Sequence, residues 1–127
     1  MTLRPYLFKT KDSSVERTRE HDEKCEYLAR LVGGESNVVI RDSRPRFYKW
    51  RGRTILQRGF KAIEFDVLVD DRIVLEYKPW IGSKHEQMEE CGIEKWFLVG
   101  ITSDGRIVLF SPKIVKPSSL RSEILRN

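Results

Sequence analysis

Residues 62–80 constrain the fold more than any other part of this 127-residue chain. Two apolar runs, Val67–Val69 and Ile73–Leu75, flank the charged segment Asp70-Asp71-Arg72. This pattern predicts a β-hairpin. Charged residues also stand at the outer flanks of both runs, where burying an unpaired charge costs several kcal/mol. Their presence in core-like strands requires an explanation.

The length of the hairpin loop decides where these charges lie. A three-residue loop pairs Val69 with Ile73, and the continued register then pairs Asp66 with Glu76. A two-residue loop would place Asp66 opposite Leu75 and split the charges between the two faces. The sequence favours the three-residue loop, because Asp tolerates the positive φ that it needs. Four charged residues then share one face. They are Glu64, Asp66, Glu76 and Lys78.

Two neighbouring carboxylates repel each other, and a divalent cation removes that conflict. Asp66 and Glu76 offer only oxygen ligands, which suit Mg²⁺ or Mn²⁺. A nearby Lys78 can orient a water or stabilise charge on a phosphate. The alternative is a pair of salt-bridged strands in which Lys78 neutralises Glu64 or Glu76. Strand alternation also predicts that Leu68 shares the face of Glu64 and Asp66.

Residues 13–32 are predicted to form the first helix, which ends at Gly33-Gly34. Four apolar residues recur at helical spacing and define its buried stripe. They are Cys25, Leu28, Ala29 and Val32. Extended towards the N-terminus, the stripe takes in Thr18 and His21, with Asp22 at its edge. Two interpretations stay open: this polar end of the helix faces water, or His21 or Asp22 faces a site.

The segment 41–61 is strongly basic. It holds eight cations and one acid, Asp42, a net charge of +7 in a chain whose formal charge is +5. Interleaved aromatic residues can stack on bases while the cations contact phosphates. The alternatives are a solvated surface, or strand residues packed on the core. The predicted nucleic-acid contacts are Arg41, Arg44, Arg46, Lys49, Arg51, Arg53, Arg58 and Lys61.

The rest of the chain predicts one domain, residues 1–127, with an N-terminal arm (1–12) and a C-terminal tail (113–127). A short helix runs from Ser83 to Cys91, with Gln87 as a further candidate site residue. Lys95–Thr102 predicts a central strand covered on both faces, and a further strand follows. The fold class is therefore α/β, a mixed central β-sheet flanked by helices.

The charged residues of the hairpin resemble the motif of a known protein family. Asp66, nine intervening residues and Glu76-Tyr77-Lys78 are similar to the motif of the PD-(D/E)XK nuclease superfamily, and Glu64-Phe65-Asp66 is similar to its Glu-x-Asp form. The order of elements over residues 13–110 also fits. The resemblance implies a restriction-endonuclease-like core, an endonuclease that hydrolyses DNA phosphodiesters, and a homodimer like the Holliday-junction resolvases. It implies Asp66 and Glu76 as metal ligands and Lys78 as the catalytic lysine.

The chain departs from the family pattern at two places. Phe65 stands where the family usually has proline, and the first helix has no inward glutamate, so Asp22 or His21 must take that role. The departure on the first helix favours the alternative function, a nucleic-acid-binding protein with a nuclease-like fold and no catalysis. RNA is a further candidate substrate, because a basic aromatic surface suits both polymers.

The remaining expectations concern surroundings and partners. The two cysteines, Cys25 and Cys91, have no metal-ligand spacing and are predicted to be free thiols without a disulfide. No apolar run approaches the roughly 18 residues that a membrane span needs. Residues 1–11 lack the apolar core of a signal peptide. We therefore expect a soluble, cytoplasmic protein that does not contact the membrane.

Overall fold

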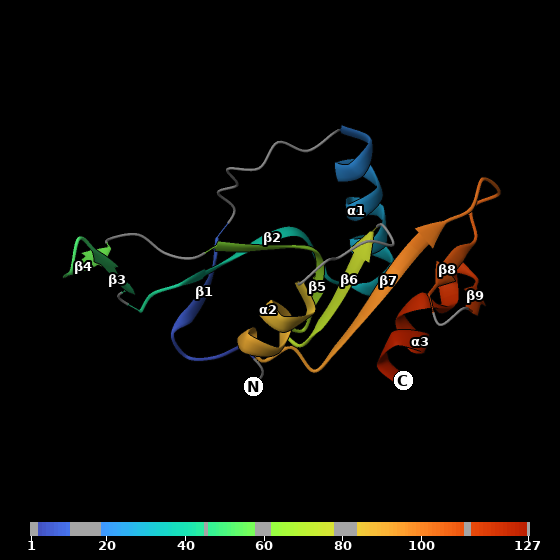
Figure 1. Cartoon of the computed structure of the whole chain (residues 1–127). Coiled ribbons are helices and arrows are strands. Elements are labelled where there is room, and N and C mark those ends of the chain that lie inside the picture. Colours follow the sequence, from blue (N-terminus) through green and yellow to red (C-terminus); the bar gives the residue numbers. More distant parts are fainter. Residues whose placement is uncertain are drawn as a thin grey trace.

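The structure is a computed structural model that describes residues 3–10, 19–44, 46–57, 62–77, 84–110 and 113–126, without the side chains at 46, 48, 57 and 84–87. It confirms the predicted α/β class: a seven-stranded mixed sheet with three α-helices (Figure 1). All neighbouring strands of the sheet are antiparallel except β6 and β7, which are parallel. In sheet order the strands are β1 (Leu7–Thr10), β2 (Glu35–Asp42), β5 (Ala62–Val69), β6 (Ile73–Tyr77), β7 (Lys95–Ile101), β8 (Ile107–Leu109) and β9 (Lys113–Val115).

The hairpin β5–β6 has the predicted three-residue loop. Val69 pairs with Ile73, and the described ladder ends at the pair Val67 and Leu75. Asp70 and Asp71 both adopt positive φ, 52° and 56°, as this tight loop requires. Both strands are buried over most of their length, so register is fixed by the match of apolar side chains as well as by the loop.

Strands β2 and β5 are both irregular at one rung. Their register would pair Asn37 with Asp66, but the described ladder skips this pair and resumes on both sides of it. Asn37 has a φ of 51°, outside the strand region. In β5 the alternation of faces also breaks there, since Phe65 and Val67 belong to core clusters on opposite sides of the sheet. Asp66 therefore lies where the sheet bends, a position at which side chains are commonly redirected.

This bend makes one prediction wrong. Leu68 packs in the same cluster as Phe65, and Glu64 precedes Phe65 in the strand, so Glu64 and Leu68 lie on opposite faces. The prediction assumed unbroken alternation along β5, and the irregular rung at Asp66 shifts the phase by one residue.

The buried residues of the first helix, α1 (Arg19–Val32), are the four predicted stripe residues. The helix ends where Gly33 takes a φ of 68° and the amide of Gly34 donates to the carbonyl of Ala29, 2.9 Å away. Gly34 also comes close to the sheet: a Cβ there would stand 2.7 Å from the carbonyl oxygen of Leu68. Only glycine allows this approach of helix end and strand, and the approach fixes how α1 crosses β5.

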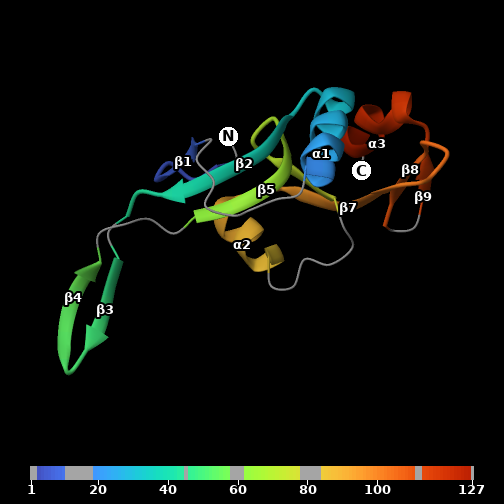
Figure 2. The ribbon, with the colours of Figure 1, turned by 90° about the horizontal axis from the view of Figure 1, so that it is seen from above.

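Helices cover both faces of the sheet (Figure 2). On one face, α1 packs with the C-terminal helix α3 (Leu120–Arg126), whose Leu120 and Ile124 are fully buried. The tail therefore packs on its own domain, and the guanidinium of Arg121 donates to the carbonyl of Val32 at the end of α1. On the other face, α2 (Lys84–Cys91) buries Met88 and Cys91.

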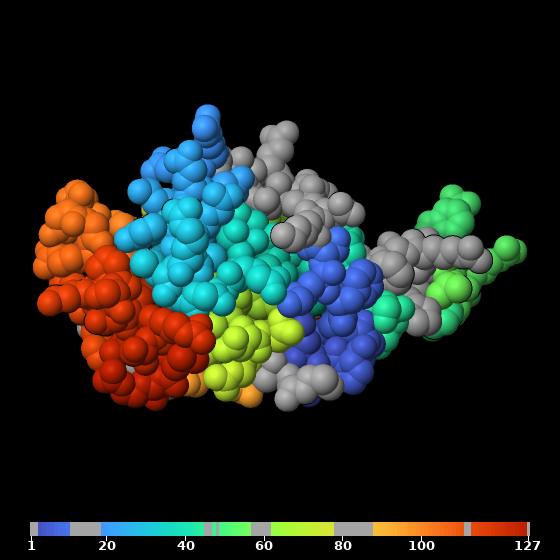
Figure 3. Space-filling view, turned by 180° about the vertical axis from the view of Figure 1, so that it is seen from behind, coloured from blue at the N-terminus to red at the C-terminus, as the bar shows by residue number. Residues whose placement is uncertain are grey.

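A second, two-stranded unit lies outside the main sheet. It pairs β3 (Arg46–Trp50) with β4 (Arg53–Gln57) around a turn at Arg51-Gly52, which has positive φ at both residues. We call this unit, residues 46–57, the ribbon. It projects from the body of the molecule (Figures 2 and 3). Neither core cluster of described residues includes a ribbon residue.

Strand β7 is less buried than the sequence predicts. Among its residues only Val99 is fully buried, and Trp96 is exposed. The reason is that the cluster beneath α2 draws its strand residues from β2, β5 and β6. The prediction that this strand is covered on both faces, which relied only on the apolar run Lys95–Thr102, is therefore wrong.

The two cysteines are free. Cys25 belongs to the core cluster between α1 and the sheet, and Cys91 belongs to the cluster between α2 and the other face of the sheet. The longest described helix has 14 residues. None of the helices in the described part of the chain has both the length and the apolar character needed to span a bilayer.

Candidate metal centre

Asp66 lies at the end of the β5–β6 ladder, one residue beyond the last pair. It is 9% exposed. The backbone N–H of Tyr77 donates to its Oδ2 at 2.8 Å. A side-chain carboxylate thus takes the place of a backbone acceptor at the point where the ladder stops. This bond fixes the carboxylate between the two strands and leaves Oδ1 directed elsewhere.

Oδ1 of Asp66 meets the first helix. Nε2 of His21 lies 3.2 Å from it, and both ring nitrogens of His21 lie 3.7 Å from Sγ of Cys25. His21 and Cys25 are four residues apart on α1, which places them on one helix face. In the part of the chain that the structure describes, these three residues are the one group of candidate metal ligands whose donor atoms all lie within 4.8 Å of one another.

The surroundings orient the His21 ring. Its Nδ1 lies 3.7 Å from Oδ1 of Asp22, and its ring meets that of Tyr77 edge-on, with 6.0 Å between centroids. Burial, and then the nearby carboxylate of Glu20, raise the pKa of the Tyr77 phenol, so this ring stays neutral around physiological pH. Of the two first-helix candidates, His21 contacts Asp66 directly and Asp22 stands behind it.

Glu76 is 4% exposed and lies on β6 one residue beyond the ladder, beside Leu98 of β7. Ile73, Leu75 and Tyr77 pack in the cluster beneath α1. Alternation along β6 therefore places the Glu76 side chain on the face of the sheet opposite α1. Glu76 does not belong to the group of His21, Cys25 and Asp66. Asp66 and Glu76 flank the end of the same ladder, but the bend at Asp66 directs the Asp66 carboxylate towards α1. The prediction that these two carboxylates share one face of the sheet is therefore wrong, because it assumed unbroken alternation along β5.

Of the other predicted site residues, one is described and lies apart from the group around Asp66, and two lie outside the described part of the structure. Glu64 is half-buried and pairs with Val39 of β2 rather than joining the group around Asp66. Lys78 and the Gln87 side chain lie outside the described residues, so their roles and the pairing of Lys78 with Glu64 stay predictions.

Two further buried acids have clear structural partners. Asp42 is held by the guanidinium of Arg44 through both carboxylate oxygens, with the shortest distance 2.6 Å. Glu123 accepts from the ammonium group of Lys113. Arg44 also stacks over the ring of Tyr6, 3.7 Å from its centroid. These ion pairs explain why Asp42 and Glu123 are buried, and they commit Arg44 to a structural contact.

The ribbon carries the exposed part of the basic segment. Lys49, Arg51 and Arg53 are exposed, as are Phe47 (67%) and Trp50 (54%). The guanidinium of Arg51 lies 4.6 Å from the centre of the Trp50 ring. Phe47 and Trp50 do not pack on the core, which removes that alternative for them. Arg41 is half-buried in β2, and Arg58, Lys61 and the Arg46 side chain lie outside the described residues.

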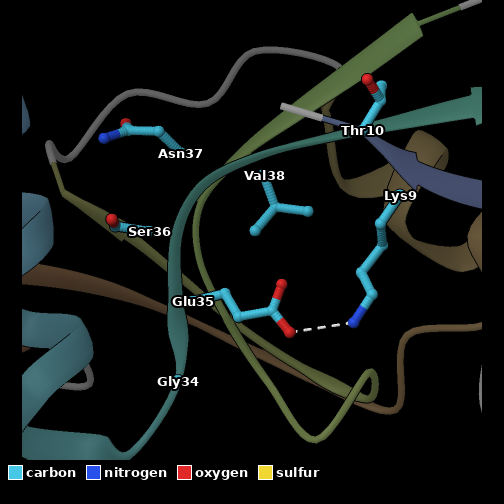
Figure 4. Close-up of a pocket in the computed structure, with 7 residues that line it drawn as sticks. All are labelled: Lys9, Thr10, Gly34, Glu35, Ser36, Asn37 and Val38. Atoms are coloured by element: carbon cyan, nitrogen blue, oxygen red, sulfur yellow. Dashed lines mark hydrogen bonds and ion pairs between the residues drawn. The ribbon is translucent and has the colours of Figure 1, made fainter. Parts of the chain in front are cut away.

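A pocket of about 360 Å³ lies beside β1 and β2. Figure 4 shows Lys9 reaching across it to Glu35, with Asn37 directed away from this pair. Lys9 also binds Asp71 of the hairpin loop at 2.9 Å, and these hydrogen bonds, first that to Asp71 and then that to Glu35, raise its pKa. None of the described residues that line the pocket is a candidate metal ligand.

The residue that sequence analysis missed is Cys25. It was assigned to the apolar stripe, correctly, but its sulfur also borders the polar group of His21 and Asp66. The available signal was the spacing His21-x-x-x-Cys25, which puts a nitrogen and a sulfur donor on one helix face. Comparison of the chain with protein-family models, with curated proteins and with solved structures found no match.

Proposed function

We propose that this protein is a metal-dependent nuclease that hydrolyses phosphodiester bonds of DNA, with a core of the PD-(D/E)XK type. The observation that carries the proposal is the position of two buried carboxylates, Asp66 and Glu76, one residue beyond the end of the same β-ladder. Burial of two carboxylates in one hairpin costs free energy, and a bound cation would offset that cost.

The donor chemistry fits the implied ion, because Mg²⁺ and Mn²⁺ prefer oxygen ligands. The carboxylates of Asp66 and Glu76 would hold it, and to share one ion the Asp66 carboxylate would have to turn from α1 towards the face of Glu76. When bound, such an ion supplies charge neutralisation at the phosphate and lowers the pKa of a water. His21 is positioned by the 3.2 Å contact of its Nε2 with Asp66. In a neutral ring that presents Nε2–H to this carboxylate, Nδ1 is the nitrogen that can accept a proton. Lys78 is assigned the stabilisation of charge on the scissile phosphate.

The ribbon supplies a reason to choose DNA as substrate. Its twelve residues contain four cations and no acid. Two exposed aromatic side chains, Phe47 and Trp50, accompany them. A two-stranded β-ribbon fits the major groove of duplex DNA, where cations contact phosphates on either side. The basic residues of this segment would therefore bind the duplex that the hairpin site cuts.

A homodimer is part of the proposal. One copy offers one hairpin with one pair of buried carboxylates, which suffices to cut one strand. Two copies related by a two-fold axis would place a site at each strand of a duplex or junction, and most small homo-oligomers have this symmetry.

One observation favours a second candidate, a DNA-binding protein without catalysis. Both oxygens of Asp66 already contact groups of the chain, Oδ1 with His21 and Oδ2 with the amide of Tyr77. In this second candidate, the contacts of His21 and Asp66 form a structural network between α1 and the sheet. The ribbon alone would then bind DNA.

The deciding experiment incubates the protein with duplex, branched and single-stranded DNA in Mg²⁺ or Mn²⁺, beside Asp66→Ala and Lys78→Ala. Glu94→Ala serves as control, because Glu94 is exposed and pairs with Arg72 at the opposite end of β6 from Glu76. The proposal expects metal-dependent cleavage by the wild type and by Glu94→Ala only. Absence of cleavage on every substrate, with DNA still bound, would establish the second candidate. Cleavage that survives in both Asp66→Ala and Lys78→Ala would remove the site assignment.

A further inference from the structure

Three donors of different chemistry meet where α1 crosses the bend of β5. They are a nitrogen of His21, the sulfur of Cys25 and Oδ1 of Asp66. Cys25 is fully buried, and the side chains of His21 and Asp66 are 15% and 12% exposed. The sulfur is thus shielded while the other two donors border solvent, so an ion can enter from their side.

The spacing of the donors matches a small tetrahedral ion. Zinc lies about 2.0–2.1 Å from nitrogen or oxygen and about 2.3 Å from sulfur, so tetrahedral ligands stand roughly 3.3–3.6 Å apart. Nε2 of His21 is 3.2 Å from Oδ1 of Asp66 and 3.7 Å from Sγ of Cys25. The remaining pair, sulfur and oxygen, lies within 4.8 Å. Small side-chain adjustments would complete the geometry.

We propose that His21, Cys25 and Asp66 form a binding site for one thiophilic divalent cation, with Zn²⁺ as the reference ion. A thiolate and an imidazole select Zn²⁺ over Mg²⁺, and three protein ligands leave a fourth position for water. This is a different site from the all-oxygen one assigned to Asp66 and Glu76, although the two share Asp66.

Groups behind the ligands support the assignment. The amide of Tyr77 holds Oδ2 of Asp66 and so leaves Oδ1 directed towards the helix. Asp22 stands 3.7 Å from Nδ1 of His21, the nitrogen that would not bind the ion. A carboxylate behind a metal-bound imidazole is the usual outer-shell partner, since it fixes the ring and its tautomer. Asp22 is therefore a positioning residue in this site.

Sharing of Asp66 has a consequence for activity. An ion held by His21 and Cys25 would keep the Asp66 carboxylate directed towards α1 and away from Glu76, so Zn²⁺ would inhibit cleavage in competition with Mg²⁺. This consequence rests on the proposed nuclease function, whereas the binding of Zn²⁺ does not.

The test measures binding by spectroscopy. Reduced, metal-free full-length protein is titrated with Co²⁺, which reports a thiolate ligand through a sulfur-to-cobalt charge-transfer band, and then with Zn²⁺ to displace it. The wild type should show the band. Cys25→Ser should lose it, and Cys91→Ser should keep it, because Cys91 is an equally buried thiol beneath the other face. Asp22→Asn should keep the band with an affinity about 10–100-fold lower.

A second measurement needs no variant. X-ray absorption at the zinc edge of the loaded wild type should show one sulfur at about 2.3 Å among nitrogen and oxygen ligands. A shell without sulfur, or a charge-transfer band that survives in Cys25→Ser, overturns the site. DNA cleavage is measured separately: a cobalt–thiolate band without cleavage under any ion would retain this site and reject the nuclease, and cleavage without the band would do the reverse.

Discussion

Nε2 of His21 lies 3.2 Å from Oδ1 of Asp66, and this contact joins the first helix to the sheet at its irregular rung. The two residues are 45 positions apart in the chain, so only the crossing of α1 over β5 brings them together. The contact links a first-helix candidate to a residue of the predicted carboxylate pair. Any function of this site therefore depends on how α1 is held against β5.

We predict that His21 and Asp66 are energetically coupled. In a double-mutant cycle with His21→Ala and Asp66→Asn, the two losses of unfolding free energy should be non-additive by about 0.5–3 kcal/mol, the range for residues in direct contact. Chemical denaturation of the four proteins at neutral pH measures this coupling free energy. The pair His21→Ala and Glu94→Ala serves as control and should be additive, because Glu94 lies at the far end of β6. Additivity in both cycles would mean that the contact contributes nothing to stability.

The crossing itself can be tested at Gly34. A Cβ at this position would stand 2.7 Å from the carbonyl oxygen of Leu68, which cannot move without disturbing β5. We expect Gly34→Ala to lower the free energy of unfolding by about 1–3 kcal/mol, as overpacking does. It should also weaken the contact of His21 with Asp66. Gly52→Ala is the control.

Gly52 has a φ of 76°, but a Cβ at this position would have no other group within 4 Å, so its substitution strains only the ribbon turn. The global unfolding transition should stay unchanged in Gly52→Ala and shift in Gly34→Ala. Equal shifts in both variants would contradict the role that we assign to the close approach of Gly34 to β5.

The sequence predicted the local parts of this site well. The loop of three residues follows from the tolerance of Asp70 and Asp71 for positive φ, and it fixed the pairing of Val69 with Ile73. The stripe of α1 followed from helical periodicity, and extending it backwards correctly placed His21 beside Cys25. Each of these inferences uses only neighbours within a few residues, where period and propensity decide.

The sequence could not predict how the sheet bends. Alternation along β5 assumes a regular strand, but the rung of Asn37 and Asp66 is skipped and the face of the strand changes there. The bend lies among contacts between segments far apart in sequence, such as that of Gly34 with Leu68, which local patterns do not encode. The proximity of Cys25 to Asp66 could not be predicted for the same reason. No local sequence pattern links the two residues.

The ribbon should carry DNA affinity without carrying stability. Replacing Lys49, Arg51 and Arg53 by Ala should weaken DNA binding and reduce the slope of log affinity against log salt by about 0.9 for each phosphate that is no longer neutralised. The midpoint of unfolding should not move, since the ribbon adds no residue to either described core cluster. Lys116→Ala, an exposed cation of the C-terminal tail, should leave the slope unchanged. A slope unaffected by the triple substitution would place the DNA-binding surface elsewhere.

Lys9 should make stability sensitive to alkaline pH. Hydrogen bonds to Asp71 and then to Glu35 raise its pKa in the folded state. A raised pKa means that the stabilisation is complete below the ordinary value of about 10.4 and is lost as pH rises through the higher folded value. Between roughly pH 9 and pH 12 the wild type should therefore lose more unfolding free energy than Lys9→Met. Parallel losses in the two proteins would show that the ion pairs of Lys9 do not contribute.

Two buried glutamates can separate the proposed catalysis from structural support. Glu76 and Glu123 are 4% and 6% exposed, and Glu123 is bound by Lys113 on the C-terminal tail. Glu76→Gln keeps the shape of the side chain but removes the charge that an ion needs, so cleavage in Mg²⁺ should fall by at least about 100-fold, the scale of losing one electrostatic contribution of this kind. Glu123→Gln should keep cleavage and lose stability, because the ammonium group of Lys113 then faces a neutral amide. Rates on duplex DNA and denaturation of both variants measure the two effects. If Glu76→Gln cuts as fast as the wild type while Glu123→Gln is the one that fails, then Glu76 is not a ligand, and the hairpin carboxylates do not act as a pair.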